Sequence, residues 1–311
     1  MRRGGERAAA ATGEESVSQR GPAALGAGAL TGGAPEISAS EASTLAEIAQ
    51  RAGGVSLGDA RGEFFRLRLG PRLRETGCER FADYIAKLSG PGAEAERRHL
   101  VEAVATHTTS FFRERRHYEH MQSVVLPERH AAGVSSRPLE IWSAASSTGA
   151  ELWSALMAVQ SWASERGLRS DCRGVGTDIS ARILRRAENA VFAEDEIVGI
   201  PDEMARRYLL RRRGASPKEP SLYRIVPELR ERARFLQANL LSLQTAPSFM
   251  ADICFLRNVL IYFEPADRLK AVAGVVSRLR TGGVLYTGHT ESLGNDVPSL
   301  RQEGAAIYRR I

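Results

Sequence analysis

Four short segments of this 311-residue chain combine polar side chains with small or apolar neighbours in a way that could support chemistry. They are residues 106–114, 142–149, 176–178 and 257–263. The small residues of 142–149 follow an apolar run and precede a helical one. They would let the backbone approach a ligand at the carboxyl end of a strand, where open α/β sheets bind nucleotides. This segment has one glycine and no G-x-G-x-x-G pattern, so an ordinary tight turn is an equally good interpretation.

Two further segments place charged or amide side chains at the end of an apolar run. Asp178 could accept both hydroxyls of a ribose, but either Asp178 or Ser180 could instead cap the next helix. Arg257 and Asn258 lie among apolar and aromatic residues, where unpaired polar groups would be costly, so packing alone explains them poorly. The two phenylalanines of residues 106–114, taken alone, are predicted to be core residues.

The chain that must position these segments has the composition of a soluble globular protein, with 43% hydrophobic and 26% charged residues. No apolar run approaches the roughly 18–20 residues that span a bilayer. The basic start is followed by Gly, Ala and acidic residues, which argues against a signal peptide. Cys78, Cys172 and Cys254 lie far apart, which excludes a disulfide framework or CxxC site and suits a reducing cytosol. We therefore expect a cytoplasmic protein.

The net charge of the chain limits the classes of molecule that it is expected to bind. Its net charge is +6, its pI is about 9.5, and all 43 basic residues are arginine except Lys87, Lys218 and Lys270. Arginine forks suit carboxylates and phosphates. Charge alone therefore allows a nucleic acid or an acidic protein surface, and genome composition would explain the arginine bias equally well.

Periodicity divides the chain into three parts. Residues 1–36 are rich in Ala, Gly and Ser and are predicted to form a disordered tail, because they bury too little surface to offset their ordering entropy. Residues 37–130 show helical periodicity and are predicted to form an all-α domain. Residues 138–311 alternate apolar runs with helical stretches, which predicts βαβ units and an α/β fold with a doubly wound, mostly parallel sheet. The basic segment 192–228 interrupts this alternation and is interpreted as an insertion.

Six segments resemble, in the same order along the chain, the motifs of the CheR-type chemotaxis receptor methyltransferases. They are Thr109–Glu114 (TSFFRE), Ile141–Gly149 (IWSAASSTG), Thr177–Ser180 (TDIS), Asn239-Leu240, Arg257–Phe263 (RNVLIYF) and Gly288–Leu293 (GHTESL). One motif would be weak evidence, but six in order are highly specific. The resemblance extends from about Ile37 to Ile311.

This resemblance implies a Rossmann-like S-adenosylmethionine methyltransferase domain with an inserted small β-subdomain, preceded by the all-α domain. The implied activity is an O-methyltransferase that forms glutamate γ-methyl esters on chemoreceptors for sensory adaptation. Its cofactor would be S-adenosyl-L-methionine and its product S-adenosyl-L-homocysteine. The implied partner is the cytoplasmic helical bundle of membrane chemoreceptors, with a receptor-tail peptide as a candidate ligand of the inserted subdomain. The enzyme would be a monomer that neither binds nucleic acid nor inserts into the membrane.

The resemblance also assigns residues to a site. Glu151 and Asp178 would hold the amino-acid end and the ribose of the cofactor, and Asn239-Leu240 would flank its adenine. The full set of implied cofactor-binding residues is His107, Thr109, Arg113, Glu151, Asp178, Asn239, Leu240, Arg257 and Asn258. Arg113 would also hold the substrate carboxylate and Tyr262 would line the methyl pocket, so these two are the implied catalytic residues.

A basic helix of the helical domain is a further implied contact with the receptor bundle. It would present Arg66, Arg68, Arg72 and Arg74, although such a face is equally well explained as merely solvated. Leu256 replaces a frequent Cys of the family.

Other interpretations compete with this one. His117 and His120 have a spacing that could chelate zinc, but neither Cys nor a well-placed carboxylate completes a tetrahedral set, so no metal is expected. A nucleic-acid amino-methyltransferase typically has an Asn/Asp-Pro-Pro-aromatic motif, and prolines do not follow Asn258. A non-catalytic cofactor-binding signalling scaffold stays an alternative, because His107 stands where the family commonly has Asn and Ala150 replaces a glutamate.

Overall fold

The computed structural model describes most of the chain after the predicted tail. The described residues are 34–57, 62–133, 137–212, 220–294 and 296–311. The disordered tail predicted for residues 1–36 therefore lies outside the described residues, except for its last three. Within the described ranges, no helix is both long enough and apolar enough to cross a membrane.

Four helices near the start of the described chain pack around a core of their own. They are α1 (Ala39–Gly53), α2 (Gly62–Thr76), α3 (Phe81–Ser89) and α4 (Glu94–Val104). Helix α1 begins at a capping box, in which Ser38 Oγ accepts from Glu41 N at 3.2 Å and Ser38 N donates to Glu41 Oε2 at 2.8 Å. The apolar faces of the helices bury Leu45, Phe65 and Tyr84 against one another, which is the pattern expected of amphipathic helices around a core.

The next helical stretch belongs to a different core. It comprises α5 (Arg116–His120), the π-helix η1 (Met121–Val125) and α6 (Leu126–Ala131). Phe111, Phe112 and Tyr118 are buried with residues of the central sheet and not with α1 to α4. The two phenylalanines are core residues, as predicted. The hydrophobic cores divide the chain between Val104 and Phe111, earlier than the predicted domain limit at residue 130, because periodicity reveals a helix but not the core that it joins.

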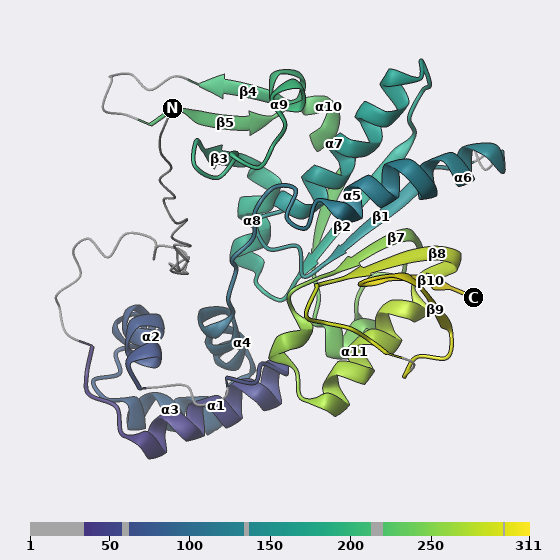
Figure 1. Ribbon diagram of the computed structural model, residues 1–311. Helices are drawn as coiled ribbons and strands as arrows, with labels where there is room; N and C mark the ends of the chain where they lie inside the picture. Colours follow the sequence, from purple (N-terminus) through teal and green to yellow (C-terminus); the bar gives the residue numbers. More distant parts are fainter. Residues whose placement is uncertain (1–33, 58–61, 134–136, 213–219, 295) are drawn as a thin grey trace, which may run out of the picture. The chain divides into compact units, whose positions relative to one another are not determined.

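A seven-stranded sheet forms the centre of the remaining chain, in the order β6-β2-β1-β7-β8-β10-β9 (Figure 1). Its strands are β1 (Leu139–Ala144), β2 (Cys172–Asp178), β6 (Ala233–Gln237), β7 (Ala251–Leu256), β8 (Leu279–Thr287), β9 (Leu300–Gly304) and β10 (Ile307–Arg310). Strands β6, β2, β1, β7 and β8 are parallel to one another, and β10 is antiparallel to both of its neighbours, β8 and β9. The order runs outward from β1 and β7 in both directions, so the fold is doubly wound, as predicted, with its switch point between these two strands.

Helices cover both faces of the sheet, so successive side chains of one strand enter different cores. The covering helices and the 3₁₀ turns after β6 and β7 are α7 (Ala150–Glu165), α8 (Ala181–Asn189), α11 (Pro265–Ser277), η2 (Leu240–Thr245) and η3 (Leu260–Tyr262). Ile141 and Ile253 are buried with residues of α7 and α8, whereas Trp142 and Cys254 are buried with residues of α11. Burial on both faces explains why these strands are mostly apolar and do not alternate regularly between apolar and polar residues.

The basic segment between α8 and β6 folds into a small antiparallel sheet, in agreement with the inserted β-subdomain that the family resemblance implied (Figure 1). Its elements are β3 (Val191–Ala193), α9 (Asp202–Tyr208), β4 (Leu209–Arg212), β5 (Leu222–Ile225) and α10 (Pro227–Arg230). Strand β5 is antiparallel to both β3 and β4. The hydroxyl of Tyr208 lies 3.2 Å from Ser161 Oγ of α7, which ties the small sheet to the larger domain. Arg213 and Lys218, two basic residues of the insertion, lie outside the described residues.

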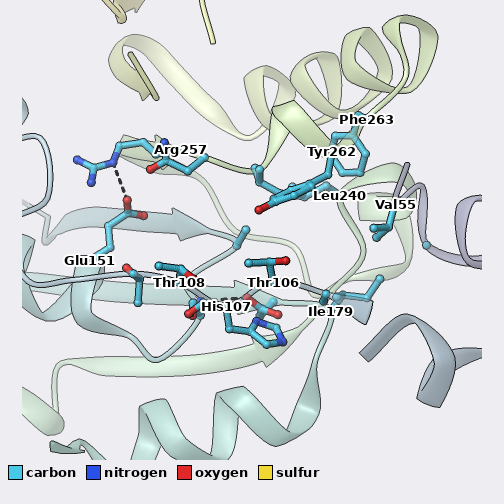
Figure 2. Close-up of a pocket in the computed structure, with 18 of the residues that line it drawn as sticks. Val55, Thr106, His107, Thr108, Glu151, Ile179, Leu240, Arg257, Tyr262 and Phe263 are labelled. Carbon is cyan, nitrogen blue, oxygen red and sulfur yellow. Dashed lines mark hydrogen bonds and ion pairs between the residues drawn. The ribbon is translucent and has the colours of Figure 1, made fainter. Parts of the chain in front are cut away.

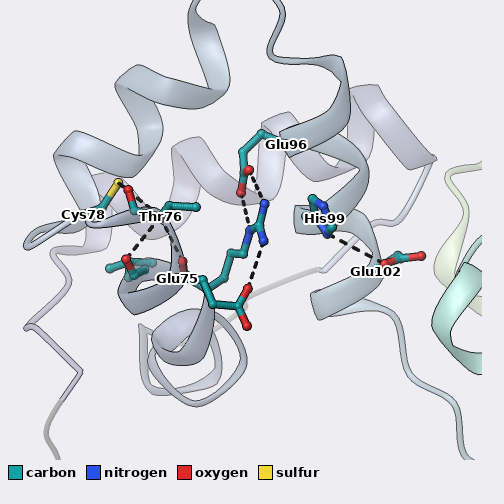
Figure 3. A network of polar contacts seen from close by, with 8 residues as sticks. Glu75, Thr76, Cys78, Glu96, His99 and Glu102 are labelled. Atoms are coloured by element: carbon teal, nitrogen blue, oxygen red, sulfur yellow. Dashed lines mark hydrogen bonds and ion pairs between the residues drawn. The ribbon is translucent and has the colours of Figure 1, made fainter.

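A largely buried ion pair joins α2 to α4 in the helical core (Figure 3). Arg72 Nε and Nη2 donate to Glu96 Oε1 and Oε2 at 2.9 and 2.6 Å, and Arg72 Nη1 donates to Glu75 at 2.9 Å. The side chain of Glu96 is 10% exposed. Hydrogen bonds from Arg72 lower the pKa of Glu96 despite its burial. The pair therefore acts as a crosslink between two helices and not as part of a free basic face.

We expect Arg72→Ala to lower the free energy of unfolding by roughly 2–3 kcal/mol, because Glu96 would keep a largely buried charge without its partner. The pKa of Glu96 is lowered in the folded protein, so this contribution should be lost as the pH falls through the acid range. Arg74→Ala is the matched control, since Arg74 is exposed on the same helix, and should change stability by less than about 0.5 kcal/mol. Urea unfolding gives the free energy of unfolding of both variants. If the two variants lose equal stability, Arg72 and Glu96 do not crosslink the helices.

Candidate functional site

The carboxyl ends of β1, β2 and β7 meet at one edge of the sheet, where a pocket opens (Figure 2). The space in the pocket is about 910 Å³ when the open solvent at its mouth is included. All ten residues singled out from the sequence line it, namely His107, Thr109, Arg113, Glu151, Asp178, Asn239, Leu240, Arg257, Asn258 and Tyr262. The structure thus brings the whole set together, while the role of each residue stays a prediction.

A buried pair of opposite charges lies at the inner end of this pocket. Arg257 Nε is 2.8 Å from Glu151 Oε2, without the alignment of a hydrogen bond, and Ser143 Oγ donates to Glu151 Oε1 at 2.6 Å. The two charged side chains are 2% and 9% exposed. Burial raises the pKa of Glu151, although Arg257 and Ser143 act against that rise. Burial on its own would lower the pKa of Arg257, but Glu151 raises it overall.

Arg257 has further partners behind the pocket that the sequence did not reveal. Its Nη1 lies 3.3 Å from His117 Nδ1, and its guanidinium lies over the rings of Tyr118 and Phe255 at 5.7 and 5.8 Å. Burial, together with Arg257, lowers the pKa of His117 to about 3, so His117 is neutral and its Nδ1 can accept from the guanidinium.

The spacing of His117 and His120, which could chelate zinc, is used for two separate contacts. His117 Nδ1 contacts Arg257, whereas His120 Nδ1 lies 3.0 Å from the hydroxyl of Tyr286.

Asp178 fixes the loop after β1 to the end of β2. Its Oδ2 accepts from Ser147 N at 2.9 Å and its Oδ1 accepts from Ser180 N at 3.0 Å. Ser180 is the N-cap of α8, with Oγ accepting from Ile183 N at 3.3 Å, so the cap role considered for Asp178 belongs to Ser180. Burial raises the pKa of Asp178, opposed by nearby His107 and by these backbone N–H groups. Its carboxylate is therefore tied to the backbone and lines the pocket.

The segment that links the two cores forms another wall of the pocket. The carbonyl of His107 accepts from Ser147 Oγ at 2.9 Å, and within the described chain its Nε2 is buried without a hydrogen-bond partner. Burial lowers the pKa of this imidazole, and Asp178 acts in the opposite sense. Arg113 Nη1 donates to the carbonyl of Thr108 at 3.2 Å.

Apolar residues complete the pocket. Figure 2 shows Leu240, Tyr262 and Phe263 on one side and His107 and Ile179 on the other. Leu240 begins η2, whose N-cap is Asn239, with Oδ1 accepting from Leu241 N at 2.9 Å.

Val55, a lining residue from the helical domain, was missed because nothing in its local sequence marks a site. It is brought there by Ser56, whose N donates to the carbonyl of Tyr262 at 2.7 Å and whose Oγ donates to Glu264 Oε1 at 2.7 Å. These contacts come from long-range packing and have no sequence signature.

Comparison with known proteins gives consistent matches over nearly the whole described chain. The family model described as "CheR methyltransferase, SAM binding domain" matches residues 107–308, and "CheR methyltransferase, all-alpha domain" matches residues 40–105. The limit between these two matches falls where the hydrophobic cores divide.

Curated relatives agree with the family models. "Chemotaxis protein methyltransferase" of Klebsiella aerogenes is 32% identical over 84% of this chain and 86% of its own length. "Chemotaxis protein methyltransferase 2" of Pseudomonas aeruginosa is 32% identical over 82% of this chain and 87% of its own. The "Chemotaxis protein methyltransferase" of Escherichia coli is 29% identical over 84% and 87%, respectively.

The buried charge pair predicts strongly non-additive substitutions. Arg257→Met should lower the free energy of unfolding by roughly 3–5 kcal/mol, because Glu151 would keep a buried charge without compensation. Adding Glu151→Gln should recover part of this loss, so the double variant is expected to be more stable than Arg257→Met alone. Urea unfolding at neutral pH compares the variants. A double variant as unstable as the sum of the two single losses would show that the charges are not coupled.

Proposed function

Since this chain belongs to the CheR methyltransferase family, we propose that it transfers methyl groups from S-adenosylmethionine to glutamate side chains of chemoreceptors, forming γ-methyl esters. The dependence on S-adenosylmethionine follows from the family, whose SAM-binding domain covers residues 107–308. The observation that supports a carboxylate substrate is Arg113. It lines the pocket and forms no ion pair with any described residue, whereas the charge of Arg257 is already paired with Glu151.

The lining of the pocket fits the chemistry of the cofactor. Glu151 would hold the amino-acid end, because each of its oxygens keeps a lone pair beyond its present contact. Asp178 would accept the ribose hydroxyls at the end of β2, as acidic residues do in dinucleotide folds. Asn239 and Leu240 would flank the adenine. The buried Nε2 of His107, which has no partner among the described residues, is a polar atom that a bound cofactor would satisfy.

The reaction does not require the protein to supply a general base. When bound, S-adenosylmethionine supplies an activated methyl group. A glutamate carboxylate is ionised at neutral pH, so the residues of the site have only to hold it in line and exclude water. Arg113 would orient this carboxylate through a bidentate pair, without neutralising it fully. Tyr262 would line the space beside the reacting oxygen.

The proposed partner is the cytoplasmic helical bundle of membrane chemoreceptors. Of the four arginines predicted to form a basic face on α2, Arg66 lies 3.3 Å from Glu36 and Arg72 is paired with Glu96. Arg68 and Arg74 are exposed, so these two would make the contact. A receptor-tail peptide at the inserted sheet, a monomeric enzyme and a cytoplasmic site of action belong to the same proposal. The relatives are named as methyltransferases, which does not favour the scaffold alternative.

A methyl-transfer assay tests the proposed substrate. The full chain is incubated with tritiated S-adenosylmethionine and receptor-enriched membranes, and the product is treated with base. We expect membrane protein to carry label that base releases as volatile methanol, because carboxyl methyl esters hydrolyse under those conditions. Stable label would indicate methylation of nitrogen instead. Absence of label together with tight cofactor binding would support the scaffold.

Arg113→Ala separates substrate orientation from cofactor binding. We expect kcat to fall by roughly 100-fold or more, because the carboxylate loses its in-line position, while the Kd for S-adenosylhomocysteine rises much less. The matched control is Arg115→Ala, since Arg115 is exposed two residues away and should leave both quantities unchanged. Initial rates and calorimetry provide the two readouts. Equal losses in turnover and affinity would refute the orienting role.

A further inference from the structure

Glu291 is a buried carboxylate that the site described above does not use. It lies in the GHTESL segment after β8 and is 0% exposed. Its Oε2 accepts from Asn258 N at 2.6 Å and from Gly288 N at 2.8 Å, and its Oε1 accepts from Ile261 N at 3.2 Å. One side chain therefore ties three backbone N–H groups from two separate segments, and charge-assisted bonds of this kind are stronger than neutral ones.

The loop that Glu291 holds is the one that carries part of the pocket wall. Asn258 has a φ of 55°, in the left-handed region that glycine and asparagine adopt more readily than most residues do. Asn258, Val259 and Tyr262 line the pocket. Glu291 contacts the N–H groups of Asn258 and Ile261, so its bonds bracket the turn that presents these side chains.

Gly288 and Asn258 pack closely around the Glu291 carboxylate, which is the anchor of this loop. A Cβ at Gly288 would lie 2.5 Å from Glu291 Oε2 and 2.8 Å from Asn258 Nδ2, so position 288 has no room for a side chain while the anchor is in place. Asn258 Nδ2 also donates to Glu114 Oε1 at 3.4 Å. The GHTESL, RNVLIYF and TSFFRE segments therefore meet around Asn258.

We propose that Glu291 is a positioning residue for methyl transfer, whose carboxylate holds the backbone from Asn258 to Ile261 so that Asn258 and Tyr262 face the cofactor pocket. The expected effect on the rate of methyl transfer rests on the proposed function. The expected effect on cofactor affinity does not need a receptor substrate, because it depends only on the shape of the pocket wall.

Glu291→Gln is the main test, because it keeps the shape and replaces one acceptor oxygen with an NH₂ group that cannot accept. We expect the Kd for S-adenosylhomocysteine to rise about 10-fold and kcat to fall by roughly 10- to 100-fold, as small misplacements of a site do. Calorimetry also gives the stoichiometry, which should stay near one if the variant is folded. Gly288→Ala displaces the same carboxylate and should give the same pattern.

Asp252→Asn is the matched control. Asp252 also accepts a backbone N–H, from Glu140 at 2.9 Å, but it lies near the amino end of β7, away from the pocket. This variant should lose stability without a change in Kd or kcat. If Glu291→Gln and Gly288→Ala behave like Asp252→Asn, with Kd and kcat within twofold of the wild type, the inference is wrong. If the wild type does not methylate receptors, the substrate proposal fails, and the Kd arm still decides the role of Glu291.

Discussion

An arginine and a glutamate buried together, Arg257 and Glu151, tie the end of β7 to the first turn of α7. A charge in such a place is tolerated only beside its partner, so the strand and the helix must meet in one register. The carboxylate near the helix N-terminus also has the sign that the helix dipole favours. His117 and Ser143 satisfy further atoms of the pair. Separating the two charges at the inner end of the pocket would leave a buried charge without its partner, which is strongly destabilising.

The outer part of the pocket depends on backbone geometry. The loop after β1 places Ala145, Ser147 and Gly149 at φ values of 72°, 50° and 83°. Gly149 is required there, because a Cβ would lie 2.8 Å from Trp153 Nε1 and 3.0 Å from Ala187. Asp178 and the carbonyl of His107 hold Ser147 from two sides. The small residues of this segment thus allow a tight backbone path, which Asp178 and the carbonyl of His107 hold in place.

The sequence predicted those features that local chemistry determines. Apolar runs that end in Asp178 or Arg257 predicted the strands and the edge where they meet, whereas the set of pocket residues came from the resemblance of the motifs to those of the family. Features that depend on long-range packing could not be predicted. The roles of Val55 and Ser56 follow from how a loop of the helical domain contacts residues 262–264. Arg72 looked like a surface residue, because its partner Glu96 lies on another helix.

Residues 105–109 connect the two hydrophobic cores and also line the pocket. A molecule that fills the pocket would therefore touch Val55, which belongs to the helical core, and Glu151 of α7, which packs on the sheet. A ligand that binds the folded protein and not the unfolded chain stabilises the folded state. Because residues 105–109 form part of the site, a ligand in the pocket would stabilise the connection between the two cores as part of the folded protein.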